Sequence, residues 1–186
     1  MREVQADPPK HGGLRRLPEA SYVGRVWVHW VMAVQQRRQG WLDSPVHAAV
    51  REAILHTTAR YRLICPAYTL MPDHFHFLMA GCDAGSHQLR AAAFLRRQLN
   101  EILASTGVVL QKQGYDHILR EHERGPDALS ATMMYILMNP VEEGLCADWR
   151  SWPWCGAVVP GYPWFTPKDG DCLDKLHRLW NDLSRE

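Results

Sequence analysis

Residues 68–78 read YTLMPDHFHFL, and this stretch decides the fold. The Met71-Pro72-Asp73 triplet is typical of a turn, and the alternating run that follows it is typical of a strand. Successive side chains on a strand point to opposite faces of the sheet. The sequence therefore predicts a strand with His74 and His76 on one face and Phe75 on the other.

Helical and strand patterns alternate on both sides of this stretch. Apolar residues recur at helical spacing in three segments, and apolar runs of strand length stand between them. We predict strands at 25–34 and 74–80, helices at 45–58 and 86–105, a short strand at 108–113 followed by an extended segment at 115–120, and a helix from 126 to 139, where Pro140 ends it. This order predicts an α+β fold, ferredoxin-like or RRM-like, with helices packed on one face of an antiparallel sheet.

Length and composition exclude several classes of protein. The chain has 186 residues, of which 46% are hydrophobic, too few for a TIM barrel or a two-domain Rossmann enzyme. No apolar run has the roughly 20 residues that cross a bilayer, and no signal peptide opens the chain, so we expect no membrane contact. Five cysteines without CxxC spacing argue against a disulfide scaffold or a zinc knuckle. A cytoplasmic location with reduced thiols is the expectation.

Domain organisation and charge both vary along the chain. We expect an irregular basic arm at residues 1–21, one catalytic domain at 22–157 and a C-terminal tail at 158–186. The formal net charge is only +1, but residues 1–62 carry +5, residues 63–130 carry −1 and residues 131–186 carry −3. This asymmetry permits a polyanion-binding face at the amino-terminal third but does not require one, and charge alone favours ordinary solvated surface.

Two pairs of residues carry chemistry. The imidazoles of His74 and His76, side by side on a strand, can ligate one divalent cation, although structural histidines fit the same pattern. Tyr135 and Asn139 are four residues apart, which stacks them on one face of a helix. A deprotonated Tyr135 is an oxygen nucleophile, and the Asn139 amide oxygen can complete a metal site. A core tyrosine and a helix-terminal asparagine are the alternative.

Together these motifs resemble the HUH endonuclease superfamily. The resemblance is closest to the IS200-like single-tyrosine transposases, and among them to the REP-associated tyrosine transposases. It spans about residues 15–157, and its most specific parts are the MPxHxH and YIxxNPV patterns. The matching segments are 16–18 (RLP), 68–78 (YTLMPDHFHFL), 114–120 (GYDHILR), 135–145 (YILMNPVEEGL) and 152–154 (WPW).

The resemblance implies a fold, a reaction and roles for individual residues. It implies an HUH endonuclease fold in which His74, His76 and Asn139 hold Mg²⁺ or Mn²⁺ and Tyr135 is the nucleophile. The implied activity is a transposase-like endonuclease and strand transferase, which cleaves single-stranded DNA near hairpins through a 5′-phosphotyrosine intermediate. The implied partner is single-stranded or hairpin DNA, such as repetitive palindromic elements, bound by a monomer or homodimer. Asp73 departs from the family pattern, in which Asn is more usual.

Candidate DNA contacts are basic or aromatic residues outside these motifs. Arginines can bind phosphates, and aromatic rings can stack on unpaired bases. The candidates are Arg15, Arg16, Arg25, Arg90, Arg96, Arg97, Tyr115, His117 and Arg120. Two other functions stay open at this point: a catalytically silent nucleic-acid-binding protein of the same fold, and a generic metal-dependent hydrolase. The hydrolase leaves Tyr135 and Asn139 unexplained.

Overall fold

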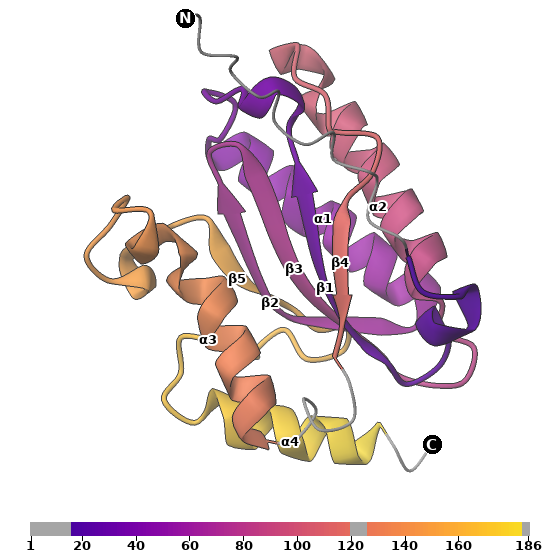
Figure 1. Ribbon diagram of the computed structural model, residues 1–186. Helices are drawn as coiled ribbons and strands as arrows, with labels where there is room; N and C mark the ends of the chain where they lie inside the picture. Colours follow the sequence, from indigo (N-terminus) through magenta and orange to yellow (C-terminus); the bar gives the residue numbers. More distant parts are fainter. Residues whose placement is uncertain (1–15, 120–125, 184–186) are drawn as a thin grey trace, which may run out of the picture.

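The fold is built on one five-stranded antiparallel sheet. The computed structural model describes residues 16–119 and 126–183. The strand order is β4-β1-β3-β2-β5 (Figure 1). The strands are β1 (Trp27–Ala33), β2 (Leu63–Met71), β3 (His74–Gly81), β4 (Tyr115–Ile118) and β5 (Cys155–Val158). The first four strands have the ferredoxin-like order, which confirms the α+β prediction, and β5 extends the sheet beside β2.

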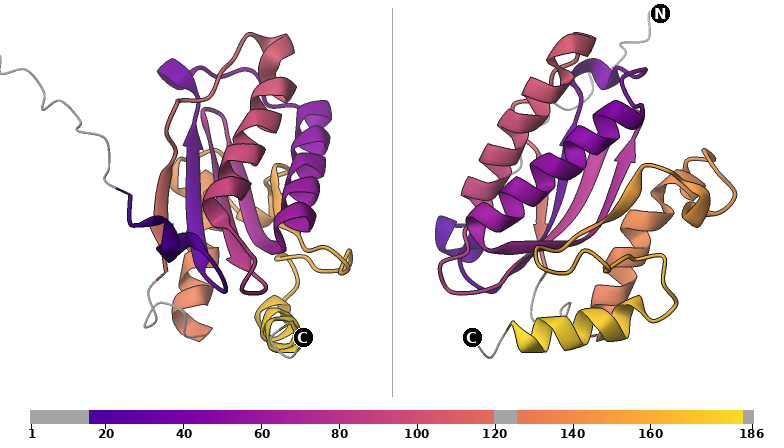
Figure 2. Two further views of the ribbon diagram at one scale, coloured as in Figure 1. Left: turned by 90° about the vertical axis from the view of Figure 1, so that its right-hand side faces the viewer. Right: turned by 180° about the vertical axis from the view of Figure 1, so that it is seen from behind.

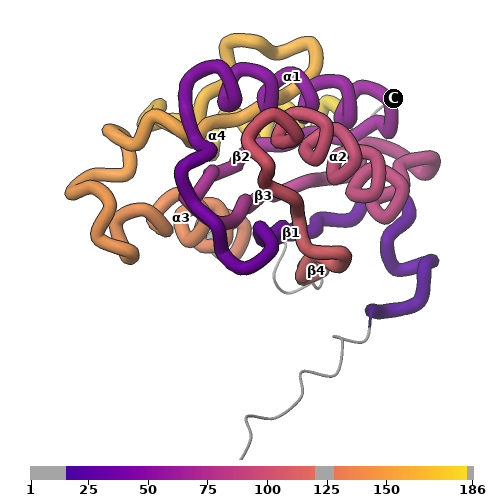
Figure 3. Tube along the Cα trace, turned by 90° about the horizontal axis from the view of Figure 1, so that it is seen from above, coloured from indigo at the N-terminus to yellow at the C-terminus, as the bar shows by residue number. Residues whose placement is uncertain are grey.

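Helices cover both faces of this sheet, although one covered face was predicted. The helices α1 (Ser44–Tyr61) and α2 (Gln88–Leu103) lie side by side on one face, and α3 (Pro126–Glu142) lies on the other (Figures 2 and 3). A fourth helix, α4 (Cys172–Asp182), lies across the end of the sheet next to α3. Ile64, Ala67 and Leu78 are buried in the α3 cluster, so the second face is also apolar enough to require cover.

The β2–β3 hairpin is the predicted turn at Pro72 and Asp73. Met71 pairs with His74 across this two-residue connection, and proline presets the backbone for the first turn position. The pairing continues to Thr69 opposite His76. Because antiparallel register is set by the turn, the residues that share a face with His76 are determined by this short connection.

The face under α1 and α2 holds the larger apolar core. Trp30, Phe75 and Phe77 come from the strands, and Ile54 and Leu95 come from the helices that cover them. All five side chains are nearly inaccessible to solvent. Asp43 caps the start of α1 by accepting a hydrogen bond from the backbone N–H of Val46 at 2.8 Å.

Three segments differ from the expectation. Residues 63–71 form a full strand, which the sequence does not mark because both of its faces are buried and the usual alternation is absent. Within 108–113 only Leu110 pairs with the sheet, through one bridge to Val34. The region after residue 154 contributes β5 and α4, and Leu176 of α4 packs in one cluster with Trp27.

The third helix also continues past the proline that was predicted to end it. Pro140 lies inside α3, which ends at Glu142. Gly144 has a left-handed backbone with φ of 69°, and its N–H donates to Val141 while the Leu145 N–H donates to Pro140. This pair of bonds is a Schellman motif, so Gly144 stops the helix. Pro140 removes a single helical donor near the end, which the turn tolerates.

None of the helices within the described residues is long and apolar enough to cross a membrane.

Candidate active site

Alternation in the sheet brings the candidate residues to the face beneath α3. His76 has Val31 of β1 on one side and Thr69 of β2 on the other. Tyr115 of β4 stands opposite Val31 and extends this row to the edge. One step along the strands, His29 of β1 stands opposite His117 of β4. Residues that are far apart in sequence thus form two adjacent rows across the sheet.

His74 and His76, called the histidine pair below, form the centre of the site. Their Nε2 atoms lie 2.9 Å apart. His74 Nδ1 lies 2.6 Å from a carboxylate oxygen of Asp73, which can only accept, so in the neutral ring Nδ1 carries the proton and Nε2 the lone pair. His76 Nδ1 lies 2.9 Å from His29 Nε2. When His76 Nδ1 donates to His29 Nε2, the Nε2 lone pairs of His74 and His76 are directed toward the same position.

Burial keeps the two inner histidines neutral. Desolvation, with smaller contributions from His29 and His74, lowers the pKa of His76 to about 3, and a hydrogen bond with Asn139 opposes this shift. Desolvation and the nearby His117 lower the pKa of His29 to about 4. A ring with such a pKa is neutral at pH 7 and keeps a lone pair available for a metal ion.

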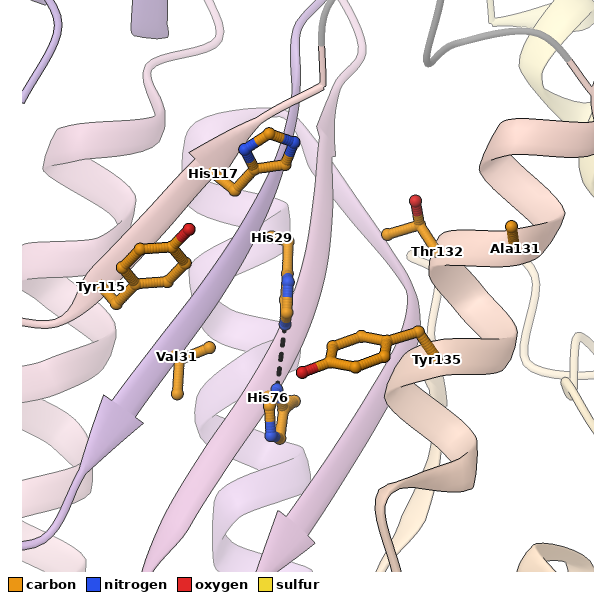
Figure 4. Close-up of a pocket in the computed structure, with 8 residues that line it drawn as sticks. All are labelled: His29, Val31, His76, Tyr115, His117, Ala131, Thr132 and Tyr135. Carbon is orange, nitrogen blue, oxygen red and sulfur yellow. Dashed lines mark hydrogen bonds between the residues drawn. The ribbon is translucent and has the colours of Figure 1, made fainter. Parts of the chain in front are cut away.

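Tyr135 approaches His29 and His76 from α3, on the opposite side of the groove. Figure 4 shows its ring pointing from α3 toward the hydrogen bond between His29 and His76. The ring centroids lie 5.9 Å from His29 and 6.2 Å from His76, both edge-on. The side chain is 50% exposed although it faces the sheet. A phenol that borders an open groove can meet a substrate that binds from solvent.

Asn139 lies one helical turn beyond Tyr135 and is buried. Its Nδ2 donates to the backbone carbonyl of Tyr135 at 2.7 Å. A side-chain hydrogen bond also joins Asn139 to His76. Asn139 therefore contacts both the α3 backbone at Tyr135 and His76.

The donor set fits one divalent cation. Two nitrogens bound at right angles to one ion at about 2.1 Å lie about 3.0 Å apart, and His74 and His76 have this spacing. Within the described residues, no group of three or more His, Cys, Asp or Glu could hold a metal ion. The Asn139 amide oxygen, water or substrate could supply a third ligand. The Thr69 hydroxyl, buried opposite His76, has no hydrogen-bond partner among the described residues and can bond to such a water.

An ion pair borders this part of the groove. Arg37 donates to Asp73 at 3.3 Å, while the other oxygen of the same carboxylate faces His74. The Arg37 side chain is 60% exposed and lines the groove of about 500 Å³ that contains His74, His76, Tyr135 and Asn139. A guanidinium at this place can contact a phosphate that approaches the histidines.

A second cavity adjoins the first. It has a volume of about 630 Å³ and shares Val31, His76 and Tyr135 with the groove that holds the histidine pair. Its other lining residues are His29, Tyr115, His117, Ala131 and Thr132 (Figure 4). Tyr135 thus stands between two compartments.

The candidate DNA-contact residues are dispersed. Tyr115 and His117 line the second cavity. Arg16 pairs with Asp116 at 3.1 Å. Arg25 donates to the backbone carbonyls of Trp180 and Leu183 at the end of α4, so its guanidinium serves to hold that helix. Arg15 and Arg120 lie outside the described residues.

The three arginines of α2 lie on the far side of the sheet from Tyr135. Arg90 and Arg97 are exposed, and Arg97 lies 3.9 Å from Glu101. Arg96 lines a small cleft together with Arg16 and Lys112. Because α2 and α3 cover opposite faces, none of these arginines can reach a phosphate at Tyr135. A longer DNA could meet them only around the edge of the sheet.

Sequence reasoning missed His29 and Arg37. His29 is a single histidine within a run of Val and Trp, and only the pairing of β1 with β3 brings it to His76. Alternation within 27–33 gives its face, and that was the one available signal. Arg37 follows β1 in a turn with positive φ, where no periodic pattern applies.

Comparison with known proteins supports the fold. No protein-family model and no curated protein matches the chain. The structure of a REP-associated tyrosine transposase bound to a REP hairpin matches with a TM-score of 0.62 and 18% identity, over 77% of this chain and 81% of that one. A candidate transposase from Deinococcus radiodurans R1 matches with a TM-score of 0.45 and 16% identity, over 60% of this chain and 92% of that one. A bacterial tRNA(His) guanylyltransferase-like protein in complex with GTP has a TM-score of 0.47 and 10% identity, over 92% and 93%. The first match confirms that the chain has the fold of a REP-associated tyrosine transposase.

Proposed function

We propose that this chain belongs to the single-tyrosine HUH transposases and is a metal-dependent endonuclease and strand transferase for single-stranded DNA beside a hairpin. The observation that carries the proposal is the position of Tyr135, which points from α3 toward His76 across an open groove. Asn139 lies one turn away and faces His76. A structural tyrosine would be covered, whereas this one is half exposed.

The fold comparison supports the choice of substrate. The protein whose fold this chain shares is described as a REP-associated tyrosine transposase bound to a REP hairpin. Hairpin DNA with single-stranded flanks, including repetitive palindromic elements, is accordingly the substrate that we propose here. The unpaired flank would enter the groove and the stem would remain outside it.

The chain's own residues have separate tasks in the proposed reaction. His74, His76 and Asn139 would hold Mg²⁺ or Mn²⁺, which as a Lewis acid polarises the scissile phosphodiester. Imidazole donors favour Mn²⁺ of these two. The Tyr135 oxygen attacks phosphorus, the bond from phosphorus to the 3′-oxygen breaks, and the proton lost by the phenol ends on the released 3′-hydroxyl, directly or through water. The product is a 5′-phosphotyrosine.

The phosphotyrosine makes the reaction reversible. A phenol, with a pKa of about 10, is a better leaving group than an alcohol, so another 3′-hydroxyl can displace Tyr135 and reseal the strand. The bond energy stays in the covalent intermediate, and no nucleotide triphosphate is required. Cleavage and joining are then the same step run in two directions.

Single-stranded DNA suits this site better than duplex DNA. Bending or opening a duplex so that one phosphate lies between a helix and a sheet costs several kcal/mol. A chain with a net charge of +1 gains little phosphate-binding energy to offset that cost. A flexible strand beside a hairpin avoids the penalty.

The test is the covalent intermediate itself. Hairpin oligonucleotides with labelled single-stranded flanks are incubated with the protein and Mn²⁺ or Mg²⁺, and a denaturing gel is examined for protein-linked DNA. We expect an adduct with wild-type protein, none in excess EDTA, and none with Tyr135→Phe, which lacks only the phenolic oxygen. The same strand annealed to its complement should react little or not at all.

The outcomes separate the candidate functions. Binding without any adduct, in either metal, would favour the catalytically silent nucleic-acid-binding protein. Cleavage that Tyr135→Phe retains would make the chain a hydrolase that uses water, and it would remove the nucleophile assignment. Equal rates on single-stranded and duplex DNA would contradict the single-strand assignment.

A further inference from the structure

The second cavity, which lies on the β4 side of Tyr135 and is called the β4-side cavity below, has no role in the reaction proposed above. It holds about 630 Å³, within the usual range for small-molecule sites, and Tyr135 forms one of its walls. His74, Asn139 and Arg37 line the other compartment, and His76 lines both. We infer that the β4-side cavity binds one unpaired DNA base, that of a nucleotide adjoining the phosphate attacked by Tyr135. This inference rests on the proposed function.

The chemistry of the walls suits a flat and uncharged ring. None of the described residues that line the cavity is acidic, and none is Lys or Arg. Tyr115 presents a ring that is 44% exposed, and the half-buried His117 lies beside it on the same strand face. Aromatic rings on a strand surface are the usual platform on which unpaired bases stack.

The phenolic hydroxyl of Tyr115 and the ring nitrogens of His117 are polar atoms in the cavity that can contact the edge of a base. The Thr132 hydroxyl donates to the Ala128 carbonyl at 3.0 Å, and Figure 4 shows its methyl group pointing toward the sheet.

The floor of the cavity is the buried ring of His29. Among the described residues that line the two compartments, Arg37 is the one Lys or Arg, and it lies in the compartment with His74, where Asp73 and Glu143 also stand. We therefore assign the phosphate to the compartment with Arg37 and the uncharged base to the other.

The shared wall links the cavity to the proposed reaction. Tyr135, His76 and Val31 line both compartments, so one nucleotide can place its base beside Tyr115 and an adjoining phosphate beside His76. A base in duplex DNA must first leave its stack and its partner to enter such a pocket, at a cost of a few kcal/mol. The cavity would thus select single strands through base capture, independently of the protein's weak net charge.

The test uses ligands that differ only by the base. The full chain, in EDTA so that no cleavage occurs, is titrated with each of the four deoxynucleoside 5′-monophosphates and with 2-deoxyribose 5-phosphate. Binding is followed by equilibrium dialysis and by the NMR signals of the histidine rings, with His117 assigned through His117→Gln. We expect at least one mononucleotide to bind in the millimolar range or tighter, to shift the His117 signal, and to bind at least about tenfold more tightly than the sugar phosphate.

Two variants locate the binding. Tyr115→Ala should weaken mononucleotide binding roughly ten- to hundredfold, the contribution of one stacked aromatic ring, whereas Tyr115→Phe should retain it. Ala131→Trp places a bulky side chain on the α3 wall and should block the cavity without touching Tyr115. Circular dichroism establishes that each variant is folded, and the Trp variant keeps the test valid if the Ala variant is not.

The result is independent of whether the chain cleaves DNA. Sugar phosphate that binds as tightly as every mononucleotide, no mononucleotide binding below about 10 mM, or binding that Tyr115→Ala and Ala131→Trp leave unchanged would each overturn the inference. An adduct with hairpin DNA alongside any of these results would leave the proposed function standing and remove the base pocket. Base-dependent binding without an adduct would do the reverse.

Discussion

The two faces of β3 are built from alternate residues of one short run, and they differ in what covers them. Phe75 and Phe77 point under α1 and α2 and have no exposed surface. His74 and His76 point under α3, where an open groove remains. One face is closed by two helices side by side, and the other is covered by a single helix across part of the sheet.

This difference separates stability from chemistry within four consecutive residues. Apolar burial on the first face contributes to the free energy of folding. On the second face, burial lowers the pKa values of His76 and His29 and yields neutral rings with available lone pairs. This destabilises the folded state as the pH falls below about 6.5, because the unfolded rings then bind protons and the folded rings do not. Substitutions on the two faces should therefore move different measurements.

The largest effect is expected from the histidine pair. His74→Ala or His76→Ala leaves one imidazole and an amide to hold the cation, so adduct formation should fall by about a thousandfold or more, and EDTA should reproduce this loss in the wild type. Because His74 borders the groove, the free energy of unfolding should change little in His74→Ala. His76 is 3% exposed and bonded to His29, so His76→Ala should lower the free energy of unfolding more than His74→Ala does. Gel quantification of the adduct and urea unfolding measure the two quantities. Undiminished cleavage in excess chelator would exclude a metal role.

Phe75→Ala tests the other face of the same strand. Removing a fully buried phenyl ring that stacks on Trp41 should lower the free energy of unfolding by about 3–5 kcal/mol. At a temperature where the variant remains folded, its rate of adduct formation should stay near the wild-type rate. Urea unfolding gives the first quantity. A variant with wild-type stability and lost cleavage would mean that the two faces are not separable.

The local sequence pattern predicts this contrast between the two faces of β3. It does not predict the position of His29, which depends on pairing between distant strands. Alternation and the turn at Pro72 and Asp73 are local, so the faces of His74 and Phe75 follow from neighbouring residues. The position of His29 beside His76 depends on how β1 pairs with β3, across 47 residues of chain, and no local pattern encodes that register.

Helix ends and buried strands account for the other differences. Pro140 is a strong local stop signal, yet the Schellman turn at Gly144 satisfies the helix end and Pro140 is tolerated inside. The β2 strand is buried on both faces and lacks the alternation that identifies a strand. Arg25 is a basic residue near the arm, but three-dimensional packing assigns it to α4.

A smaller effect is expected from His29, which contacts His76 but is not one of the two proposed histidine ligands. His29→Ala removes the partner of His76 Nδ1, so the His76 ring loses its fixed orientation, and Mn²⁺ affinity should fall about 10–100-fold. His29→Gln keeps an acceptor near the position of Nε2 and should recover most of that affinity. Electron paramagnetic resonance titration of free Mn²⁺ measures both variants. Equal affinities for wild type and His29→Ala would show that β1 does not position the ring.

The smallest effect is expected at Asn139, and there two substitutions separate two tasks. Its side chain is hydrogen-bonded to His76, and its amide nitrogen donates to the Tyr135 carbonyl at 2.7 Å. Asn139→Ala removes both contacts, but water can replace a neutral amide oxygen as a ligand, so cleavage should fall by only about tenfold, less than for either histidine.

Asn139→Asp keeps an oxygen ligand and adds a negative charge, which should tighten Mn²⁺ binding, yet an ionised carboxylate cannot donate to the Tyr135 carbonyl. If the amide acts mainly as a ligand, the Asp variant should cleave at least as well as wild type at limiting Mn²⁺. If it acts mainly to hold the helix turn that carries Tyr135, the Asp variant should bind Mn²⁺ tightly and still cleave as slowly as the Ala variant. Because we propose that the polar face uses its buried groups as ligands, whereas the apolar face uses its buried groups for packing, we expect the first result. Slow cleavage by a metal-saturated Asp variant would show that this face, too, relies on structural support from its buried polar groups.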